Sequence, residues 1–286
     1  MAEAFPRRLD DLKRFTAGLL ERLGVPPANA ALVASRVLWF EAADAAHLGI
    51  ATLPELLDHL ASSRFDPRSE GRIGSERNGT AVFDACQGIP LLVLARAAEL
   101  AMEKGRDAGV GLVRVDGVGP LRSAAGIVAE VAVGPFAALA LGPSPGEGAG
   151  NAFALAIPGP TGLPLVYDPA LATPKPAGAS RRKPAARPSV LPGLDLALLD
   201  ALRPERSWLV GAVSTTAFEP LTALQERAGH VVAGLEPGEG RLLPEAWERR
   251  RRAARDEGVR VSPEPAAALA SWAHRLGVPL PDGWAD

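Results

Sequence analysis

The sequence predicts an α/β layered fold with a helical N-terminal region and a helical C-terminal tail. In the first 65 residues, apolar side chains recur at helical spacing. From residue 80 to residue 142, runs with the pattern of strands are separated by helical stretches. A further strand and three helices follow a segment rich in Pro, Ala and cations at 173–192. Alternating strands and helices are typical of a layered core, so we expect one compact unit.

The N-terminal region contains three predicted helices. The first covers residues 9–23, where apolar residues recur every three or four positions and Gly24 ends the pattern. Asn29 is expected to cap the second helix. The third runs from Thr52 to Leu60, with a proline in its first turn. These helices predict an apolar face that packs against the rest of the chain.

The remainder of the chain divides into three predicted parts after the helical N-terminal region (1–72). They are an α/β core (73–172), a Pro- and Arg-rich linker (173–206), and a returning strand with C-terminal helices (207–286). Strands are predicted at 80–85, 109–117, 136–142, 151–159, 163–170 and 207–215, and helices at 95–104, 123–131, 219–235, 244–258 and 264–276.

Composition excludes several classes of function. A formal net charge of −2 gives no overall attraction to nucleic acid or to an anionic membrane. The single cysteine, Cys86, excludes an intrachain disulfide and any site built from several cysteines. The sequence has no signal-peptide pattern and no apolar run of about 20 residues. We therefore expect a soluble protein in a reducing, cytoplasmic setting, without a metal site.

One of the four histidines is a candidate for proton transfer. His59 and His274 lie in predicted helices among charged residues, which favours a surface position, and His230 is interpreted as structural. His47 lies in a turn-like stretch, "EAADAAHLGI", and Asp44 precedes it by three residues. In a helical turn that spacing would let the Asp44 carboxylate orient the imidazole. A purely structural histidine remains the alternative.

Two glycine-rich segments could bind an anion. The stretch "VDGVGPLRSAAG" (115–126) runs from strand through turn to helix and carries Arg122, a candidate anion anchor, whereas "GPSPGEGAGN" (142–151) is followed by no clear helix. Neither contains the G-x-G-x-x-G fingerprint of a Rossmann fold. The arginines at 249–252 are flanked by acidic residues and are interpreted as a solvated helix face.

The ordered set of elements resembles a known family. The stretches "LKRFTAGLLERLGVPPANAALVASRVLWFEAADAAHLGIATLPELLDHL", "GTAVFDACQGIPLLVLARAAELAMEKGRDAGVGLVRV", "LVYDPALAT" and "LLPEAWERRRRAARDEGVRV" are together similar to the malate/L-lactate dehydrogenase family. This non-Rossmann family also includes ureidoglycolate and sulfolactate dehydrogenases and cyclic-imine carboxylate reductases. The resemblance implies a homodimer that binds NAD or NADP and transfers a hydride to or from a 2-oxo acid.

Position by position, the resemblance retains scaffold residues more than chemical ones. The Ser-His-Gly of the family aligns with His47-Leu48-Gly49, so the family histidine falls on Leu48. The acid/base histidine of the family falls within 115–126, where this chain has none. A Thr-Asn-Pro near the cofactor aligns with Gly150-Asn151-Ala152 and keeps Asn151, and an Asp-Met-Ala-Thr-Ser segment aligns with residues 168–172 and keeps Asp168.

Two functions of different classes remain open. The first is a divergent NAD(P)-linked oxidoreductase with impaired or altered activity on a small 2-oxo, 2-hydroxy or cyclic-imine acid. Its catalytic residues would be His47, Asp44 and Asp168, and Asn151, Gly150 and Arg122 would lie at the cofactor. The second is a catalytically inactive relative that binds or stabilises a partner, for example an active paralogue in a heterodimer.

Overall fold

The computed structural model describes residues 6–119, 121–143, 151–172, 207–235 and 240–284. Its main feature is an eight-stranded sheet with the strand order β2-β3-β4-β8-β5-β6-β7-β9. Only β3 and β4 pair in parallel, and every other neighbouring pair is antiparallel. Strand β8 comes from the C-terminal part of the chain and is inserted between β4 and β5. The fold is therefore α/β and layered, as the sequence predicts, with a mostly antiparallel sheet.

The helices and strands of the described residues have the following bounds. The helices are α1 (Leu9–Arg22), α2 (Pro27–Ala42), α3 (Leu53–Ala61), α4 (Pro90–Ala108), α5 (Ala125–Val131), α7 (Leu221–Ala233), α8 (Pro244–Asp256) and α9 (Pro263–Leu276). The strands are β1 (Pro6–Arg7), β2 (Arg72–Arg77), β3 (Thr80–Asp84), β4 (Val110–Asp116), β5 (Phe136–Pro143), β6 (Asn151–Ile157), β7 (Leu165–Tyr167), β8 (Trp208–Ser214), β9 (Arg241–Leu242) and β10 (Val259–Arg260). Short 3₁₀ turns include η1 (Ala46–Leu48), η2 (Ile50–Thr52) and η3 (Pro169–Leu171).

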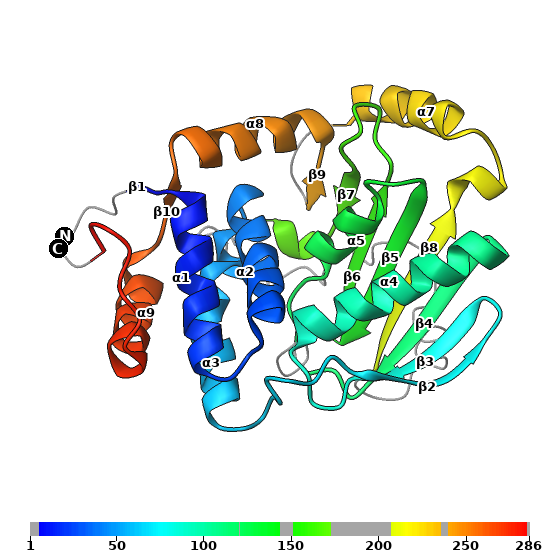
Figure 1. The fold of residues 1–286 in the computed structure, drawn as a ribbon. Coiled ribbons are helices and arrows are strands. Elements are labelled where there is room, and N and C mark those ends of the chain that lie inside the picture. The colour runs from blue at the N-terminus through cyan, green and yellow to red at the C-terminus, as the bar shows by residue number, and fades with distance from the viewer. Residues whose placement is uncertain (1–5, 120, 144–150, 173–206, 236–239, 285–286) are drawn as a thin grey trace, which may run out of the picture.

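Helices α4 and α5 cover one face of the sheet (Figure 1). The residues of β4 alternate between this face and the other, and Gly111, Val113 and Val115 are buried beneath α4. A Cβ atom at Gly111 would overlap the backbone carbonyl of Ala101 in α4. The helix therefore packs directly on the strand backbone, which is why a glycine is required there.

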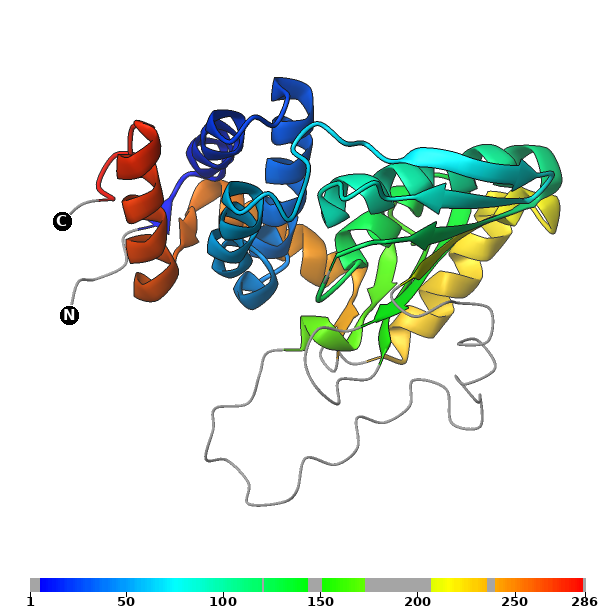
Figure 2. The same cartoon turned by 90° about the horizontal axis from the view of Figure 1, so that it is seen from below.

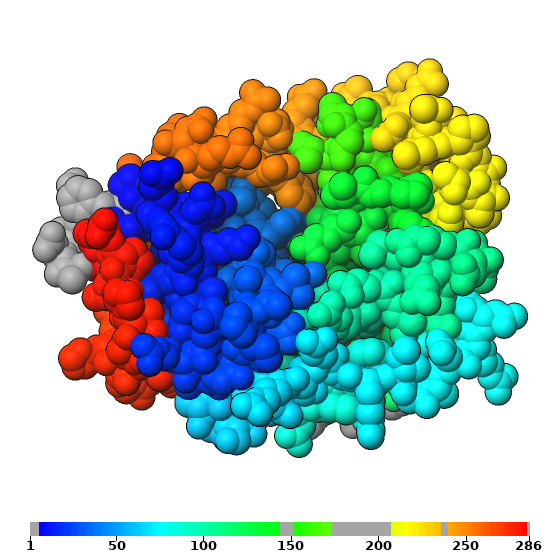
Figure 3. All heavy atoms as spheres, in the orientation of Figure 1, coloured from blue at the N-terminus to red at the C-terminus, as the bar shows by residue number. Residues whose placement is uncertain are grey.

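The N-terminal helices form a second block beside the sheet (Figures 1 and 2). Helix α9 returns from the C-terminal end of the chain and packs on α1 and α3, so the two ends of the sequence share one apolar cluster. A separate cluster lies between the sheet and its covering helices, and Leu91 contacts both. Helix α8 runs along the top of the helical block from β9 at the edge of the sheet, and the surface view shows the two blocks in contact (Figures 1 and 3).

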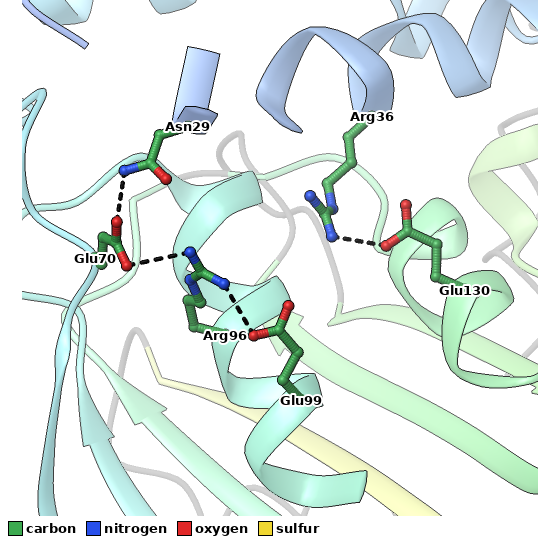
Figure 4. Close-up of polar contacts among 6 residues, drawn as sticks. All are labelled: Asn29, Arg36, Glu70, Arg96, Glu99 and Glu130. Carbon is green, nitrogen blue, oxygen red and sulfur yellow. Dashed lines mark hydrogen bonds and ion pairs between the residues drawn. The ribbon is translucent and has the colours of Figure 1, made fainter. Parts of the chain in front are cut away.

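Polar contacts also join α2 to the sheet block (Figure 4). Arg36 of α2 donates through Nη2 to Glu130 Oε2 of α5 at 2.7 Å. Asn29 donates to Glu70 Oε1 at 2.8 Å, and the other oxygen of Glu70 pairs with Arg96 of α4 at 3.2 Å. Through these contacts α2 is attached to α5 directly and to α4 by way of Glu70. Both helices follow α2 by more than 40 residues in the chain, so the contacts fix the position of the N-terminal block.

Two expectations about elements are wrong in detail, and one strand has no predicted counterpart. Asn29 is not the cap of α2, because Pro27 already occupies the first turn and the Asn29 side chain is buried against Glu70. The predicted helix at 123–131 begins at Ala125, and the Ser123 hydroxyl accepts the Ala125 N–H. Strand β2 has no counterpart among the predicted elements. Its six residues are all exposed, so it lacks the apolar alternation of the other strands.

In the part of the chain that the structure describes, no helix combines the length and the apolar character needed to cross a bilayer.

Candidate functional site

A cavity of about 70 Å³ lies where the N-terminal helices meet the sheet block. Its wall comes from α2, η1, α3, the start of α4 and the segment 121–123. At its buried end are Phe40, Leu48 and Ile89, all less than a tenth exposed. Apolar side chains make up most of the remaining wall, as is usual for small-molecule sites.

The cavity wall includes one buried polar residue, Ser123, and its titratable side chains lie where the wall is more exposed. Arg122 Nη2 is 3.4 Å from Glu55 Oε2, and these side chains are 54% and 53% exposed. His59 also lines the cavity and packs edge-on against Phe65, with 5.0 Å between the ring centroids. The expected surface position of His59 is therefore only half right, because its ring is half-buried in this wall. One guanidinium, one carboxylate and one imidazole thus line the cavity, and a second guanidinium, that of Arg64, lies against the imidazole with Nη1 3.4 Å from His59 Nε2.

His47 lies behind the cavity wall and is held by a backbone carbonyl. Its Nε2 is 2.9 Å from the oxygen of Ala170 in η3. A carbonyl oxygen only accepts hydrogen bonds, so Nε2 carries the proton in this contact and Nδ1 is the ring nitrogen left for proton exchange. His47 belongs to the 3₁₀ turn η1, within the stretch that the sequence marks as turn-like. Its neighbour Leu48 contributes to the cavity instead.

Asp168 positions the segment that holds His47. Its side chain is 1% exposed, with Oδ1 accepting the Ala170 N–H at 2.8 Å and Oδ2 accepting the Ser123 hydroxyl at 2.6 Å. Ser123 also lines the cavity. The structure therefore brings Asp168 and His47 together through Ala170, and it places Asp168 as a buried support rather than as a group in the cavity wall.

Asp44 does not have the predicted partner. It follows the end of α2 in a left-handed backbone conformation with φ of 59°, and its carboxylate lies 3.8 Å from Arg250 Nη2 of α8. Arg250 also donates to the carbonyl of Ala43 at 2.8 Å. The expected pairing with His47 requires a continuous helical turn, and the backbone at Asp44 interrupts it. The contact also corrects the prediction of a fully solvated arginine face on α8.

Glu41 is a buried carboxyl group beneath the same turn. Burial, partly offset by the hydrogen bond from the Ile50 N–H and reinforced by the charge of Asp44, raises the pKa of Glu41 to about 7. Its Oε1 accepts the Ile50 N–H at 2.7 Å, and a Cβ atom at Gly49 would overlap it. The hydrogen bond from Ile50 to Glu41 therefore holds the start of η2, which leads into α3.

The structure gives less support to the residues that were expected to bind a cofactor. Gly150 lies outside the described residues, and Asn151 is the first residue of β6, where its backbone is opposite Pro143. Helix α5 has seven residues, and its first N–H already binds Ser123, so the segment 115–126 does not fit a phosphate site. Among the described residues, no three His, Cys, Asp or Glu side chains gather as metal ligands.

Sequence reasoning missed the roles of Ser123, Glu41 and His59. Serine and glutamate are common, and only burial reveals that Ser123 and Glu41 support the turn segments. For His59, a signal was present. It lies four residues after Glu55 on α3, a spacing that places the two side chains on the same helix face.

Comparisons with known proteins give matches in sequence and in fold. The sequence profile described as "Malate/L-lactate dehydrogenase" matches residues 8–177, which is more than half of the chain. L-sulfolactate dehydrogenase of Methanocaldococcus jannaschii is 29% identical over 101 residues, covering 35% of this chain and 29% of that protein. Malate dehydrogenase of Pyrococcus horikoshii is 28% identical over 104 residues, covering 36% and 29%. These matches span about three tenths of the length of the curated relatives.

Solved structures share the fold along nearly the whole chain. Malate dehydrogenase from P. horikoshii superimposes with a TM-score of 0.79 at 18% identity and covers 96% of both chains. Sulfolactate dehydrogenase from M. jannaschii gives 0.76 at 18% identity, covering 96% of this chain and 98% of the other. The Δ1-piperideine-2-carboxylate reductase from Pseudomonas syringae gives 0.67 at 17%, covering 93% and 99%. At this identity the likeness establishes the fold alone.

Proposed function

The chain belongs to the malate/L-lactate dehydrogenase family, and on that premise we propose that it is a divergent oxidoreductase acting on a small organic acid in the cavity beside α3. The substrate would be a 2-oxo, 2-hydroxy or cyclic-imine acid. The observation that carries this proposal is the group at the cavity mouth, where Arg122 can attract a carboxylate and Glu55 and His59 can exchange protons.

Carbonyl reduction requires a proton donor as well as a hydride donor. The oxygen of a 2-oxo acid becomes an alkoxide when its carbon accepts a hydride, and a positioned acid typically contributes about 10² to 10⁴ in rate. His59 lines the cavity, whereas His47 is tied to Ala170 and would act through Nδ1. A changed set of acid/base groups is consistent with impaired or altered activity.

The family consists of NAD(P)-dependent dehydrogenases, which suggests a nicotinamide cofactor as the hydride source. Asn151 and Gly150 would lie beside it. Because α5 does not fit a phosphate, the diphosphate of the cofactor would need another part of the chain.

Calorimetric titration of the purified protein with NADH and NADPH tests the proposal. Saturable micromolar binding would support it. Turnover of a 2-oxo acid panel should then fall at least tenfold in His59→Ala, and less in His47→Ala. His274→Ala is a matched control, because His274 is exposed on α9 outside the cavity. Failure of both nucleotides to bind at millimolar concentration would contradict the proposal.

A second candidate is a catalytically inactive relative that binds or stabilises a partner. It is supported by the contact between His47 and Ala170, since this hydrogen bond gives His47 a structural role that requires no catalysis. Under this function the protein binds no nicotinamide nucleotide and converts no acid, yet forms a stable complex with a related chain.

The partners and the setting remain proposals. We propose a homodimer, or a heterodimer with a paralogue, in the cytoplasm. Light scattering on the purified chain gives its mass directly. A monomer of 29.7 kDa across the micromolar range would contradict the homodimer.

A further inference from the structure

We propose that Ser123 is a specificity-determining residue of the cavity. It presents a hydrogen-bond acceptor, so it selects the hydroxyl group of a short 2-hydroxy acid over the carbonyl group of the corresponding 2-oxo acid. The reaction on that acid rests on the proposed oxidoreductase function. The preference between the two acids does not, because it can be measured by binding without nucleotide.

The hydrogen of the Ser123 hydroxyl is committed to a buried carboxylate. Ser123 Oγ donates to Asp168 Oδ2 at 2.6 Å, the length that is typical of a hydroxyl bonded to an ionised carboxylate. The two residues are 2% and 1% exposed, and the other carboxylate oxygen accepts the Ala170 N–H. An ionised carboxylate can only accept hydrogen bonds, so the Ser123 hydrogen stays in this contact and does not face a ligand.

The Ser123 oxygen still has a lone pair to offer. A hydroxyl oxygen has two lone pairs, of which one accepts the Ala125 N–H at 3.1 Å. Among the described residues no other group donates to the second lone pair, and Ser123 lines the cavity. A ligand hydroxyl can donate to it. A ligand carbonyl has no hydrogen, so two acceptors would face each other in a buried place, which costs binding free energy.

The other hydroxyl in the described cavity wall has the same polarity. Thr52 Oγ1 donates to the carbonyl of Gly49 at 2.8 Å, so it too offers only lone pairs. Arg122 and His59 can donate, but the carboxylate that they would bind is common to both acids. The hydroxyl groups of the wall therefore distinguish the two acids.

The size of the cavity limits the ligand to a short acid. A bound water needs about 10 to 15 Å³, so a cavity of about 70 Å³ holds on the order of five to seven non-hydrogen atoms. Three-carbon acids are of this size. Lactate and pyruvate are a matched pair, because they have the same number of non-hydrogen atoms and differ only in the group at the second carbon.

Calorimetry on the full chain without nucleotide tests the preference. The better-bound enantiomer of lactate should bind at least about fivefold more tightly than pyruvate. Ser123→Ala removes the acceptor and should bring the two affinities within about twofold of each other. Asp168→Asn should reverse the preference. The asparagine oxygen accepts the Ala170 N–H, its NH₂ group donates to Ser123, and the Ser123 hydrogen becomes free for the carbonyl of pyruvate.

Ser35→Ala and Asp11→Asn are the matched controls, because they remove a hydroxyl and a carboxylate outside the cavity and should leave the preference unchanged. Thermal unfolding of each variant identifies loss of fold, and a reversed preference cannot result from loss of fold. Equal or tighter binding of pyruvate by the unmodified chain, or no binding of either acid, would overturn the inference. Preference for lactate in a chain that binds neither NADH nor NADPH would contradict the proposed reaction and support the role of Ser123.

Discussion

At the scale of single residues, the buried carboxyl of Glu41 makes stability depend on pH. Burial raises its pKa from 4.5 to about 7, so the folded protein retains the proton after the unfolded chain has lost it. This contribution is fully present below pH 4.5 and is lost as the pH rises through 7. Glutamine at this position cannot ionise, and its amide oxygen can still accept the Ile50 N–H.

Glu41→Gln should therefore stabilise the protein above pH 7 by about 2 to 3 kcal/mol, and by much less at pH 5. Urea unfolding of both proteins at pH 5, 6, 7 and 8 measures the difference, in which groups common to both cancel. Asp44→Asn is the control and should have a smaller effect, because burial is the larger cause. A difference that is the same at all four pH values would show that Glu41 titrates normally.

At the scale of elements, Ser123 connects the start of α5 to the turn that holds His47. Its hydroxyl donates to Asp168 at 2.6 Å and accepts the Ala125 N–H at 3.1 Å, and the side chain is buried. Ser123→Ala should lower the free energy of unfolding by about 2 kcal/mol, because a buried amide loses its acceptor. Chemical denaturation measures the loss. Ser35→Ala, which removes a hydroxyl bonded to a carbonyl of its own helix, should change it by less than about 0.5 kcal/mol.

The elements also show how far sequence reasoning reaches. The spacing of apolar residues predicts most helices and strands. A helix or strand that buries one face must place its apolar residues at the spacing that is typical of a helix or of a strand. It does not predict that β8 enters between β4 and β5, since strand order depends on packing between distant segments. The same limit applies to the functional site, because its contacts also join distant segments of the chain. His47 can be identified as a rare residue type, but its partner is a backbone carbonyl 123 residues away, which no side-chain pattern marks.

At the scale of the whole molecule, the helical block and the sheet block should unfold together. Leu91 contacts both apolar clusters, and the contacts of Asn29 and Arg36 cross between the blocks (Figure 4). Scanning calorimetry should therefore give one transition with equal calorimetric and van't Hoff enthalpies. Two separate transitions in the unmodified chain would contradict this coupling.

The contact between Arg36 and Glu130 tests the origin of that coupling. The Arg36 side chain is 5% exposed, and its Nε and Nη1 have no hydrogen-bond partner among the residues that the structure describes, so Glu130 supplies its compensating charge. Glu130→Ala leaves a buried, unpaired cation and should cost about 2 kcal/mol, reduced from the fully buried case because Glu130 is half exposed. Arg36→Met removes the cation with its unsatisfied nitrogens and should cost less, within about 1 kcal/mol. Arg14→Gln, in an exposed pair with Asp11, should be nearly neutral and serves as the control. If Arg36→Met proved more destabilising than Glu130→Ala in urea unfolding, the guanidinium would be stabilised by groups other than Glu130, and the attachment of α2 to α5 would not depend on this ion pair.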